Sequence, residues 1–354
     1  MSVETEPNPS LTPGVTSRPV RHRLRSEVKP LRQRVGRQAE LAVHPELAGK
    51  FTRCYGVPGD QTLQVVKAAP VDTDAGMTVI AGFRTIALAC LRHLQGNERG
   101  VCESDDPEFV HQARVAIRRL RSAIRVWKPR LTEAFVGEFD PLWQALARQL
   151  GETRNWDVFR AETLPSILAT FPECPHAREL TDYSRRRCAV NRQVAGTALS
   201  SGDYSRLLLD FNAAVLALPE RQDRRLDVFA PHCLDKRARK VWQLAQEALT
   251  SDASARHRLR VAYKRLRYAL EFFAPLFPGD LLRSYHLAAS GLQEMLGQLN
   301  DLAVARELLD EALPGAPGER IRCWLEARSD ALLPQLEGLL GDFYGQRVPW
   351  QQDS

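Results

Sequence analysis

The sequence predicts an all-α protein made of two related halves. From about residue 75 onward, apolar residues recur at intervals of three and four, and prolines or glycines interrupt the pattern. β-branched alternating runs bounded by turns are hard to find. Residues 111–129 also match residues 257–275 without a gap, at an offset of 146. Together these observations predict two helical halves, near 75–218 and 225–342, related by a pseudo-two-fold axis.

The segment before the helical halves has a different character. Between residues 17 and 38, eight Lys and Arg residues stand against one Glu, and few residues are apolar. Such a segment cannot bury a core, so we expect residues 1–40 to be a disordered Arg-rich tail. Residues 41–74 show little pattern and carry turn signals at 56–59, which predicts a linker or N-terminal extension.

Composition excludes several classes of protein. No apolar run approaches the ~18–20 residues that a membrane-spanning helix needs, and the first residues do not resemble a secretory signal. The seven cysteines are odd in number and widely spaced, without a CxxC motif. This spacing argues against a disulfide framework and against a zinc module. We therefore expect a cytoplasmic protein without a membrane span.

The repeat brings identical residue types to matching positions. At the offset of 146 the identical pairs are His111/His257, Arg114/Arg260, Val115/Val261, Ala116/Ala262, Arg119/Arg265, Leu120/Leu266, Arg121/Arg267, Ala123/Ala269 and Pro129/Pro275. The same offset continues further along the chain, where Leu150 and Gly151 match Leu296 and Gly297, and Val158 matches Val304. An ungapped match over almost fifty residues indicates two copies of one helical unit.

At about 100° per residue, the cations of each copy fall on one side of a helix. We call them the basic stripe: His111, Arg114, Arg118, Arg121 and Arg125 in the first copy, and His257, Arg260, Lys264 and Arg267 in the second. Apolar residues form another side, where we expect the core: Ala113, Ile117, Leu120, Ile124 and Trp127, and Leu259, Tyr263, Leu266, Leu270 and Phe273. Arg119 and Arg265 lie on the other flank of the stripe.

Like charges at i and i+4 oppose helix formation, and a bound anion would relieve the repulsion. From His111 to Arg121 the stripe runs ~15 Å, which suits a linear polyanion better than a single phosphate. The alternatives are a solvated face, or a stripe whose acidic partners come from another helix. The presence of the pattern in both copies favours anion binding.

These motifs resemble the CHAD family, the conserved histidine α-helical domains. The resemblance rests on residues 110–121, their echo at 257–273, and Leu-Gln-Glu-Met-Leu-Gly-Gln-Leu-Asn-Asp-Leu at 292–302, and it covers roughly 75–342. It implies two pseudo-two-fold-related four-helix bundles that form one CHAD domain and bind inorganic polyphosphate on a basic central surface. Where the first half of the family usually has Arg-Asp, this chain has Arg154-Asn155-Trp156-Asp157. If the family's Asp pairs with a stripe arginine, Asn155 would weaken that pairing, or Asp157 would take the place of the Asp.

Carried over by position, the resemblance implies that the stripe residues His111, Arg114, Arg118, Arg121, His257, Arg260, Lys264 and Arg267 bind polyphosphate. We add the flanking Arg119 and Arg265. Further candidates for anion contacts are Arg125, Arg154, Arg178, Arg185, Arg192, Arg237, Arg239 and Lys240. For Arg178, Arg185 and Arg192, which lie seven residues apart, a solvated face is the alternative. Many relatives also carry a CYTH domain, whose Glu-x-Glu-x-Lys signature is missing here, so the chain looks like a stand-alone CHAD protein.

No catalytic motif stands out in the sequence. GxSxG, HExxH, Walker A and GxGxxG are missing, and no DxD-type Mg²⁺ site lies near the stripe. We therefore expect a non-catalytic polyphosphate-binding protein without cofactor or metal. The partners that we expect are polyphosphate granules or a polyphosphate-metabolising enzyme. The alternatives are a nucleic-acid-binding protein, which we expect to act non-specifically through the tail and stripe, and a regulatory scaffold.

Overall fold

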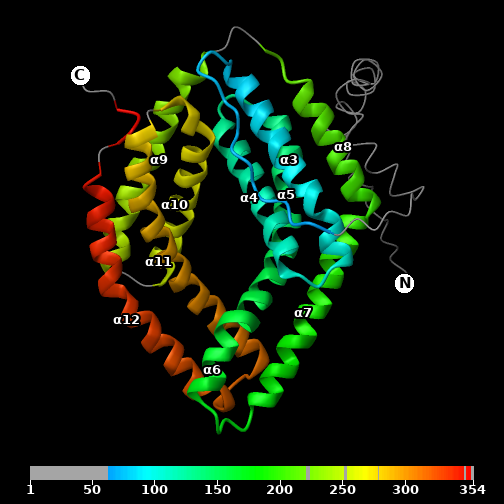
Figure 1. The fold of residues 1–354 in the computed structure, drawn as a ribbon, viewed down its shortest axis with the longest axis vertical. Coiled ribbons are helices and arrows are strands. Elements are labelled where there is room, and N and C mark those ends of the chain that lie inside the picture. The colour runs from blue at the N-terminus through cyan, green and yellow to red at the C-terminus, as the bar shows by residue number, and fades with distance from the viewer. Residues whose placement is uncertain (1–62, 221–223, 251–252, 278, 347, 352–354) are drawn as a thin grey trace, which may run out of the picture. The chain divides into compact units, whose positions relative to one another are not determined.

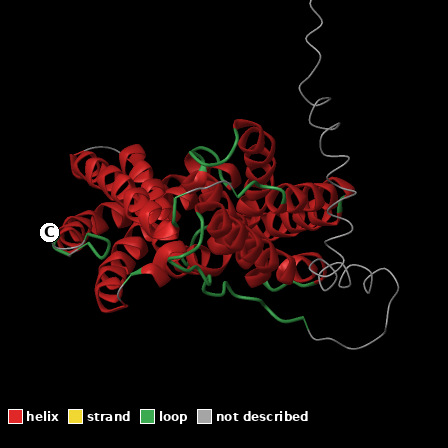
Figure 2. Ribbon diagram, turned by 90° about the horizontal axis from the view of Figure 1, so that it is seen from above, coloured by secondary structure: helices red, strands yellow, loops and turns green. Residues whose placement is uncertain are grey.

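The structure of the chain, a computed structural model, describes residues 63–220, 224–250, 253–277, 279–346 and 348–351. These residues form helices and connecting loops, and none of them belongs to a named strand (Figures 1 and 2). The prediction of an all-α fold is confirmed. Residues 1–62 lie outside the described residues, so the Arg-rich tail and most of the predicted linker do too.

The first half of the domain is built from six helices and a π-helical segment. They are α3 (Val79–Glu103), α4 (Pro107–Trp127), α5 (Glu133–Val158), the π segment η1 (Phe159–Thr163), α6 (Leu164–Thr170), α7 (Ala177–Ser200) and α8 (Gly202–Leu216). In this half α3 packs against α4 and α7, and α5 packs against α4 and α7, which makes a four-helix bundle to which α8 is added.

The second half is built from four long helices. They are α9 (Leu226–Thr250), α10 (Ala253–Phe273), α11 (Gly279–Ala312) and α12 (Glu319–Tyr344), with short 3₁₀ turns at Ala274–Leu276 and Ala316–Gly318. α9 packs against α10, α10 against α11, and α11 against α12. In Figure 1, α11 and α12 run down the page to meet the region of α6 and α7.

The helices that carry the two sequence copies correspond position by position. α4 begins at residue 107 and α10 at 253, and they end at 127 and 273, so both bounds differ by the repeat offset of 146. α5 and α11 likewise begin at 133 and 279. α11 then continues without a break, whereas the π segment η1 interrupts the path from α5 to α6.

Local signals in the sequence start the helices of the first half. The side chain of Asp106 accepts a hydrogen bond from the backbone amide of Glu108 at 2.9 Å, and Pro107 follows as the first residue of α4. Thr132 caps α5 in the same way, through a bond from the amide of Phe135 at 3.2 Å. The start of α4 thereby fixes where the basic stripe begins.

The main hydrophobic core joins the two halves. The core positions that we predicted on both copies are all buried. Trp127 is fully buried, and its ring centroid lies 5.2 Å from that of Phe273. These two residues are related by the repeat offset and contact each other, so they lie near the pseudo-two-fold axis. Trp127 also donates to the carbonyl oxygen of Val79 at 2.7 Å.

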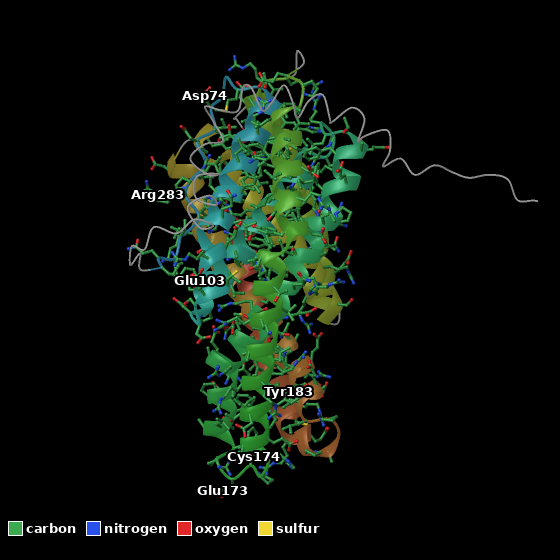
Figure 3. All side chains as sticks on the ribbon, turned by 90° about the vertical axis from the view of Figure 1, so that its right-hand side faces the viewer. Asp74, Glu103, Glu173, Cys174, Tyr183 and Arg283 are labelled. Carbon is green, nitrogen blue, oxygen red and sulfur yellow. The ribbon has the colours of Figure 1, made fainter. Side chains whose placement is uncertain are left out.

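A second, smaller core forms where the far ends of the two halves meet. It unites Trp156, Phe159 and Leu180 of the first half with Leu309 and Ile321 of the second. Figure 3 shows this end of the domain, where Cys174 and Tyr183 are labelled. The two halves are thus held together at two places, where α4 meets α10 and at this second core.

The described residues before α3 follow an extended path. The side-chain amide of Asn97 on α3 pairs with both the backbone N–H and the C=O of Val66, at 3.1 and 2.8 Å. A Cβ at Gly96 would lie 2.9 Å from the Val66 side chain, so glycine allows this close approach. Among the described helices, none has a stretch long and apolar enough to cross a bilayer.

Candidate anion-binding site

Cationic side chains from both halves line one pocket between α4, α5, η1, α10 and α11. The pocket has a volume of about 170 Å³. Its polar lining residues are His111, Arg114, Arg118, Arg154, Asn155, Thr163, Arg260, Lys264, Gln293, Asn300 and Asp301. Five residues of the basic stripe thus meet in one place, together with Arg154. We call this the central pocket.

The central pocket follows the internal repeat. Six pairs of its lining residues are related by the offset of 146: Arg114/Arg260, Arg118/Lys264, Arg154/Asn300, Asn155/Asp301, Val158/Val304 and Phe159/Ala305. Each pair contributes one residue from α4, α5 or η1 and one from α10 or α11. Neither half therefore forms the pocket alone, and the two stripes face a shared space.

The cations of the central pocket lower one another's pKa values. Burial, followed by the charges of Arg118, Arg260 and Arg114, lowers the pKa of Lys264 to about 6. Burial and neighbouring arginines lower the pKa of Arg114 and that of Arg260 to about 10. The pocket therefore concentrates positive charge that the protein itself leaves poorly compensated.

Burial is also the largest cause that lowers the pKa of His111, and the charge of Arg154 is the next. Among the described residues that line the central pocket, Asp301 is the one acid. Its charge raises the pKa values of Arg260 and Lys264, but it does not offset their burial. An anion with several charges would supply the missing compensation.

A second pocket opens along the groove between α4 and α5, with a volume of about 540 Å³. It is lined by Arg114, Arg118, Arg121, Pro141, Gln144, Ala145, Ala147 and Arg148. Arg121 is held there by Asp140 and Gln144, with Nε–Oδ1 and Nη2–Oε1 distances of 3.0 Å each. We call this the α4–α5 groove.

Several predicted residues lie outside the central pocket. His257 is exposed and does not line it, although its counterpart His111 does. Arg265 is exposed on the other flank of α10. Arg267 stands over the ring of Tyr268, 4.4 Å from the centroid, and its Nη1 lies 3.8 Å from Glu271. Equivalent residues at the ends of the two stripes therefore have different surroundings.

Arg119 has a structural role in place of the predicted anion contact. Its side chain is only 1% exposed, and its Nη2 lies 2.6 Å from the carboxylate of Glu271 on α10. It also donates to the carbonyl oxygen of Ala69 at 3.3 Å. The acidic partner thus comes from another helix, which is the alternative that the sequence left open. Arg119 ties the first half to the second.

Of the further candidates, Arg154 lines the central pocket and the others do not. Arg125 lies 3.9 Å from Asp140, Arg185 3.5 Å from Asp182, and Arg239 3.9 Å from Asp235. Arg237 donates to the carbonyl oxygen of Cys233 at 2.8 Å. Arg178 and Lys240 are exposed.

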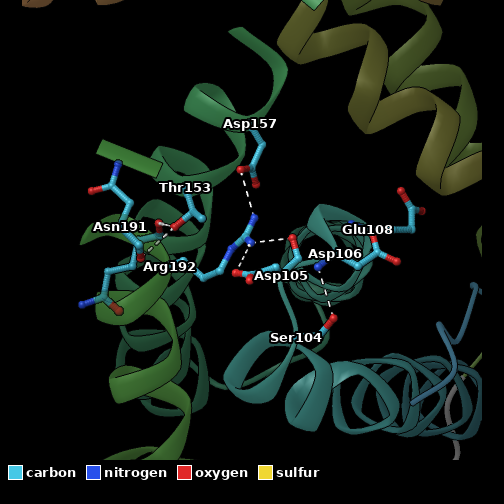
Figure 4. A network of polar contacts seen from close by, with 9 residues as sticks. Ser104, Asp105, Asp106, Glu108, Thr153, Asp157, Asn191 and Arg192 are labelled. Carbon is cyan, nitrogen blue, oxygen red and sulfur yellow. Dashed lines mark hydrogen bonds and ion pairs between the residues drawn. The ribbon is translucent and has the colours of Figure 1, made fainter. Parts of the chain in front are cut away.

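Arg192 joins the start of α4 to the end of α5 (Figure 4). It pairs with Asp105 at 3.0 Å and with the buried Asp157 at 3.2 Å. Asp157 therefore contacts an arginine of α7 and not one of the basic stripe. Burial raises the pKa of Asp157, while Arg192 lowers it. Asn155, where the family usually has Asp, lines the central pocket.

Some residues of the site were not identified from the sequence. They are Gln293, Asn300 and Asp301 in the central pocket and Gln144 and Arg148 in the α4–α5 groove. Applying the repeat offset to Arg154 and Asn155 would have found Asn300 and Asp301. Nothing in the pattern of α5 marks Arg148, which faces the stripe only because α4 and α5 pack together. Within the described part of the chain, no group of three or more His, Cys, Asp or Glu side chains could hold a metal ion.

Comparisons with known proteins agree with this architecture. The family model for the CHAD domain matches residues 85–310. The crystal structure of the CHAD domain from the plant Ricinus communis superposes with a TM-score of 0.73 at 32% sequence identity, covering 81% of this chain and 99% of that one. PptA from Streptomyces chartreusis shares the fold, with a TM-score of 0.55 at 15% identity, covering 78% of this chain and 98% of that one. No curated protein matches. The repeat, the paired bundles and these matches show that the chain belongs to the CHAD domain family.

Proposed function

We propose that this protein binds inorganic polyphosphate in the central pocket and does not transform it. The observation that carries the proposal is the meeting of Arg114 and Arg118 with Arg260 and Lys264 around a space that contains one acid. Phosphate oxygens would accept charge-assisted hydrogen bonds from both repeats at once. The CHAD family is associated with polyphosphate binding, which favours the same ligand.

The absence of catalysis is also part of the proposal. Phosphoryl transfer normally uses carboxylate-held Mg²⁺ ions that bridge phosphate oxygens. The lining residues of the central pocket offer one carboxylate, Asp301, among several cations. This donor set suits retention of an anion better than its hydrolysis.

A competition titration tests the proposal. The full-length protein, holding labelled long-chain polyphosphate at fixed salt, is challenged with double-stranded DNA at equal phosphate concentration. We expect polyphosphate to win by orders of magnitude, and its affinity to fall steeply as salt rises. Equal competition by DNA would instead support the nucleic-acid alternative and contradict the proposal.

Two charge-matched variants give the titration its residue-level control. Arg114→Ala/Arg118→Ala removes two cations from the central pocket, whereas Arg178→Ala/Arg239→Ala removes two exposed cations elsewhere. We expect the first variant to lose the preference for polyphosphate and the second to retain it, with the helical circular dichroism of both unchanged. Equal losses in the two variants would mean that net charge and not the pocket governs binding.

We further propose that polyphosphate binding places the protein in the cytoplasm at polyphosphate granules, or beside an enzyme that acts on polyphosphate. The free thiols of the described cysteines are compatible with a reducing compartment. Fluorescence microscopy of the tagged protein, with and without polyphosphate in the cell, tests this placement.

A further inference from the structure

We propose that a long polyphosphate chain leaves the central pocket over the first repeat only, through the α4–α5 groove, and that Arg148 binds its outer segment. The inference rests on the proposed function and adds a direction and a chain-length preference to it. It is carried by two adjoining pockets that share two arginines and by a charge difference between the two repeats.

The central pocket and the α4–α5 groove adjoin each other, since Arg114 and Arg118 line both. Arg114 lies over Gly151 of α5, where a Cβ would stand 3.7 Å from its Nε atom. On α5, Arg154 and Asn155 on one side of Gly151 line the central pocket, and the residues before Gly151 line the groove. The side chains of Arg114 and Arg118 therefore lie at the boundary between the central pocket and the α4–α5 groove.

The cations of α4 form a line along this path. His111 lies at the inner end, beside Arg154, and Arg121 lies at the outer end, beside Gln144. From residue 111 to residue 121 the line is about 15 Å long at 1.5 Å per residue. Arg148 adds a cation from the facing helix, and its side chain is exposed. A linear anion in the groove would thus have arginines on both sides.

The carboxylate of Asp140 marks where this line of positive charge ends. Its Oδ1 lies 3.0 Å from Arg121 Nε, and its Oδ2 lies 3.9 Å from Arg125. The pairing partly satisfies Arg121 and Arg125, while Arg114 and Arg118 stand further from that acid along α4. We therefore assign the outermost phosphate contacts to the region between Arg118 and Arg148.

The second repeat has an acid at two positions where the first has an arginine. The counterpart of Arg148 at the offset of 146 is Glu294, and the counterpart of Arg125 is Glu271. Glu271 lies 3.8 Å from Arg267, the stripe residue that corresponds to Arg121. A polyanion leaving along α10 and α11 would meet these two acids. Among the described residues, arginines thus line both sides of the α4–α5 groove, whereas α11 has an acid at the position equivalent to Arg148.

The sizes of the two pockets predict how affinity depends on the length of the polyphosphate chain. The central pocket, at about 170 Å³, accommodates a short run of phosphates, and further phosphates must occupy the adjoining groove. Short chains therefore use the central pocket alone. Longer chains gain the contact of Arg148, so affinity per chain should increase until the groove is filled.

Isothermal titration of the full-length protein with tripolyphosphate and with long-chain polyphosphate tests the inference. The variant is Arg148→Glu, which gives the first repeat the charge of the second. The matched control is Arg178→Glu, an identical charge change at an exposed position that lines neither pocket. Circular dichroism verifies that both variants fold.

We expect Arg148→Glu to weaken long-chain binding by about tenfold, the lower end of what a charge-assisted contact contributes, and to leave tripolyphosphate binding unchanged. Arg178→Glu should change neither. The inference is overturned if Arg148→Glu leaves long-chain binding unchanged, or if it weakens both ligands equally. If the wild-type protein binds neither ligand, the proposed function itself fails.

Discussion

Lys264 should take up a proton when polyphosphate binds. Burial and the charges of Arg118, Arg260 and Arg114 lower its pKa from 10.5 to about 6. The one nearby acid, Asp301 on α11, opposes this shift only in part. A bound polyanion would reverse the electrostatic contribution and raise the pKa again, because negative charge favours the ammonium form. The proton is then part of the binding reaction.

The size of the effect follows from the position of the pKa. With a pKa of about 6, roughly one tenth of the lysines are charged at pH 7. Restoring the full charge then requires nearly one proton per bound site. By linkage, affinity falls up to about tenfold per pH unit from pH 6 upward, until the pH exceeds the pKa of the occupied site. Below pH 6 the contribution of Lys264 becomes flat.

Calorimetry in buffers of different ionisation enthalpy measures this proton uptake directly. Long-chain polyphosphate keeps the number of titrating end groups low. Wild type should take up close to one proton at pH 7.5, and Lys264→Met almost none, while His111→Gln should retain the uptake at that pH. Equal uptake by wild type and Lys264→Met would refute the reasoning, since the proton would then bind elsewhere.

Three further substitutions test the roles of buried polar groups. Glu271→Gln leaves the 1% exposed Arg119 without its anionic partner. Unfolding in urea should therefore show a free energy of unfolding lower by about 3 kcal/mol, with polyphosphate affinity nearly unchanged. A marked loss of affinity with normal stability would contradict the structural role of Arg119. Tyr263 donates a buried hydrogen bond to the carbonyl oxygen of Ala289 at 2.6 Å, whereas the buried hydroxyl of Tyr268 has no partner among the described residues. Tyr263→Phe should therefore cost about 1 kcal/mol, and Tyr268→Phe should be neutral or stabilising, with thermal denaturation as the measure. Equal losses in the two would mean that the Tyr268 hydroxyl is satisfied in solution.

The sequence predicts the fold and the centre of the site well because both follow from local periodicity. The predicted core positions of residues 111–129 and 257–275 are buried as the helical spacing requires. Arg114, Arg118, Arg260 and Lys264 then face the same pocket, because the repeat forces equivalent faces of α4 and α10 together.

The margins of the site depend on neighbours that helical spacing cannot identify. Arg119 and Arg121 belong to the same helix, yet Glu271 of the other half buries the first and Asp140 of α5 pairs with the second. His257 matches His111 in sequence but is exposed, because equivalent positions on α4 and α10 do not have equivalent surroundings. Periodicity assigns a residue to a face of its helix, and only the packing decides what covers that face.

The covalent connection between the two halves has an evolutionary consequence. Two separate copies of one half, assembled as a homodimer, would carry identical side chains at every equivalent position. In the single chain each half can change independently. At equivalent positions of the repeat, Arg148 corresponds to Glu294, Asn155 to Asp301 and Arg154 to Asn300. Fusion thus permits a symmetric scaffold to acquire a distinguishable entrance and end. A site that began with two equivalent directions can in this way impose one direction on a ligand chain that is the same when read from either end.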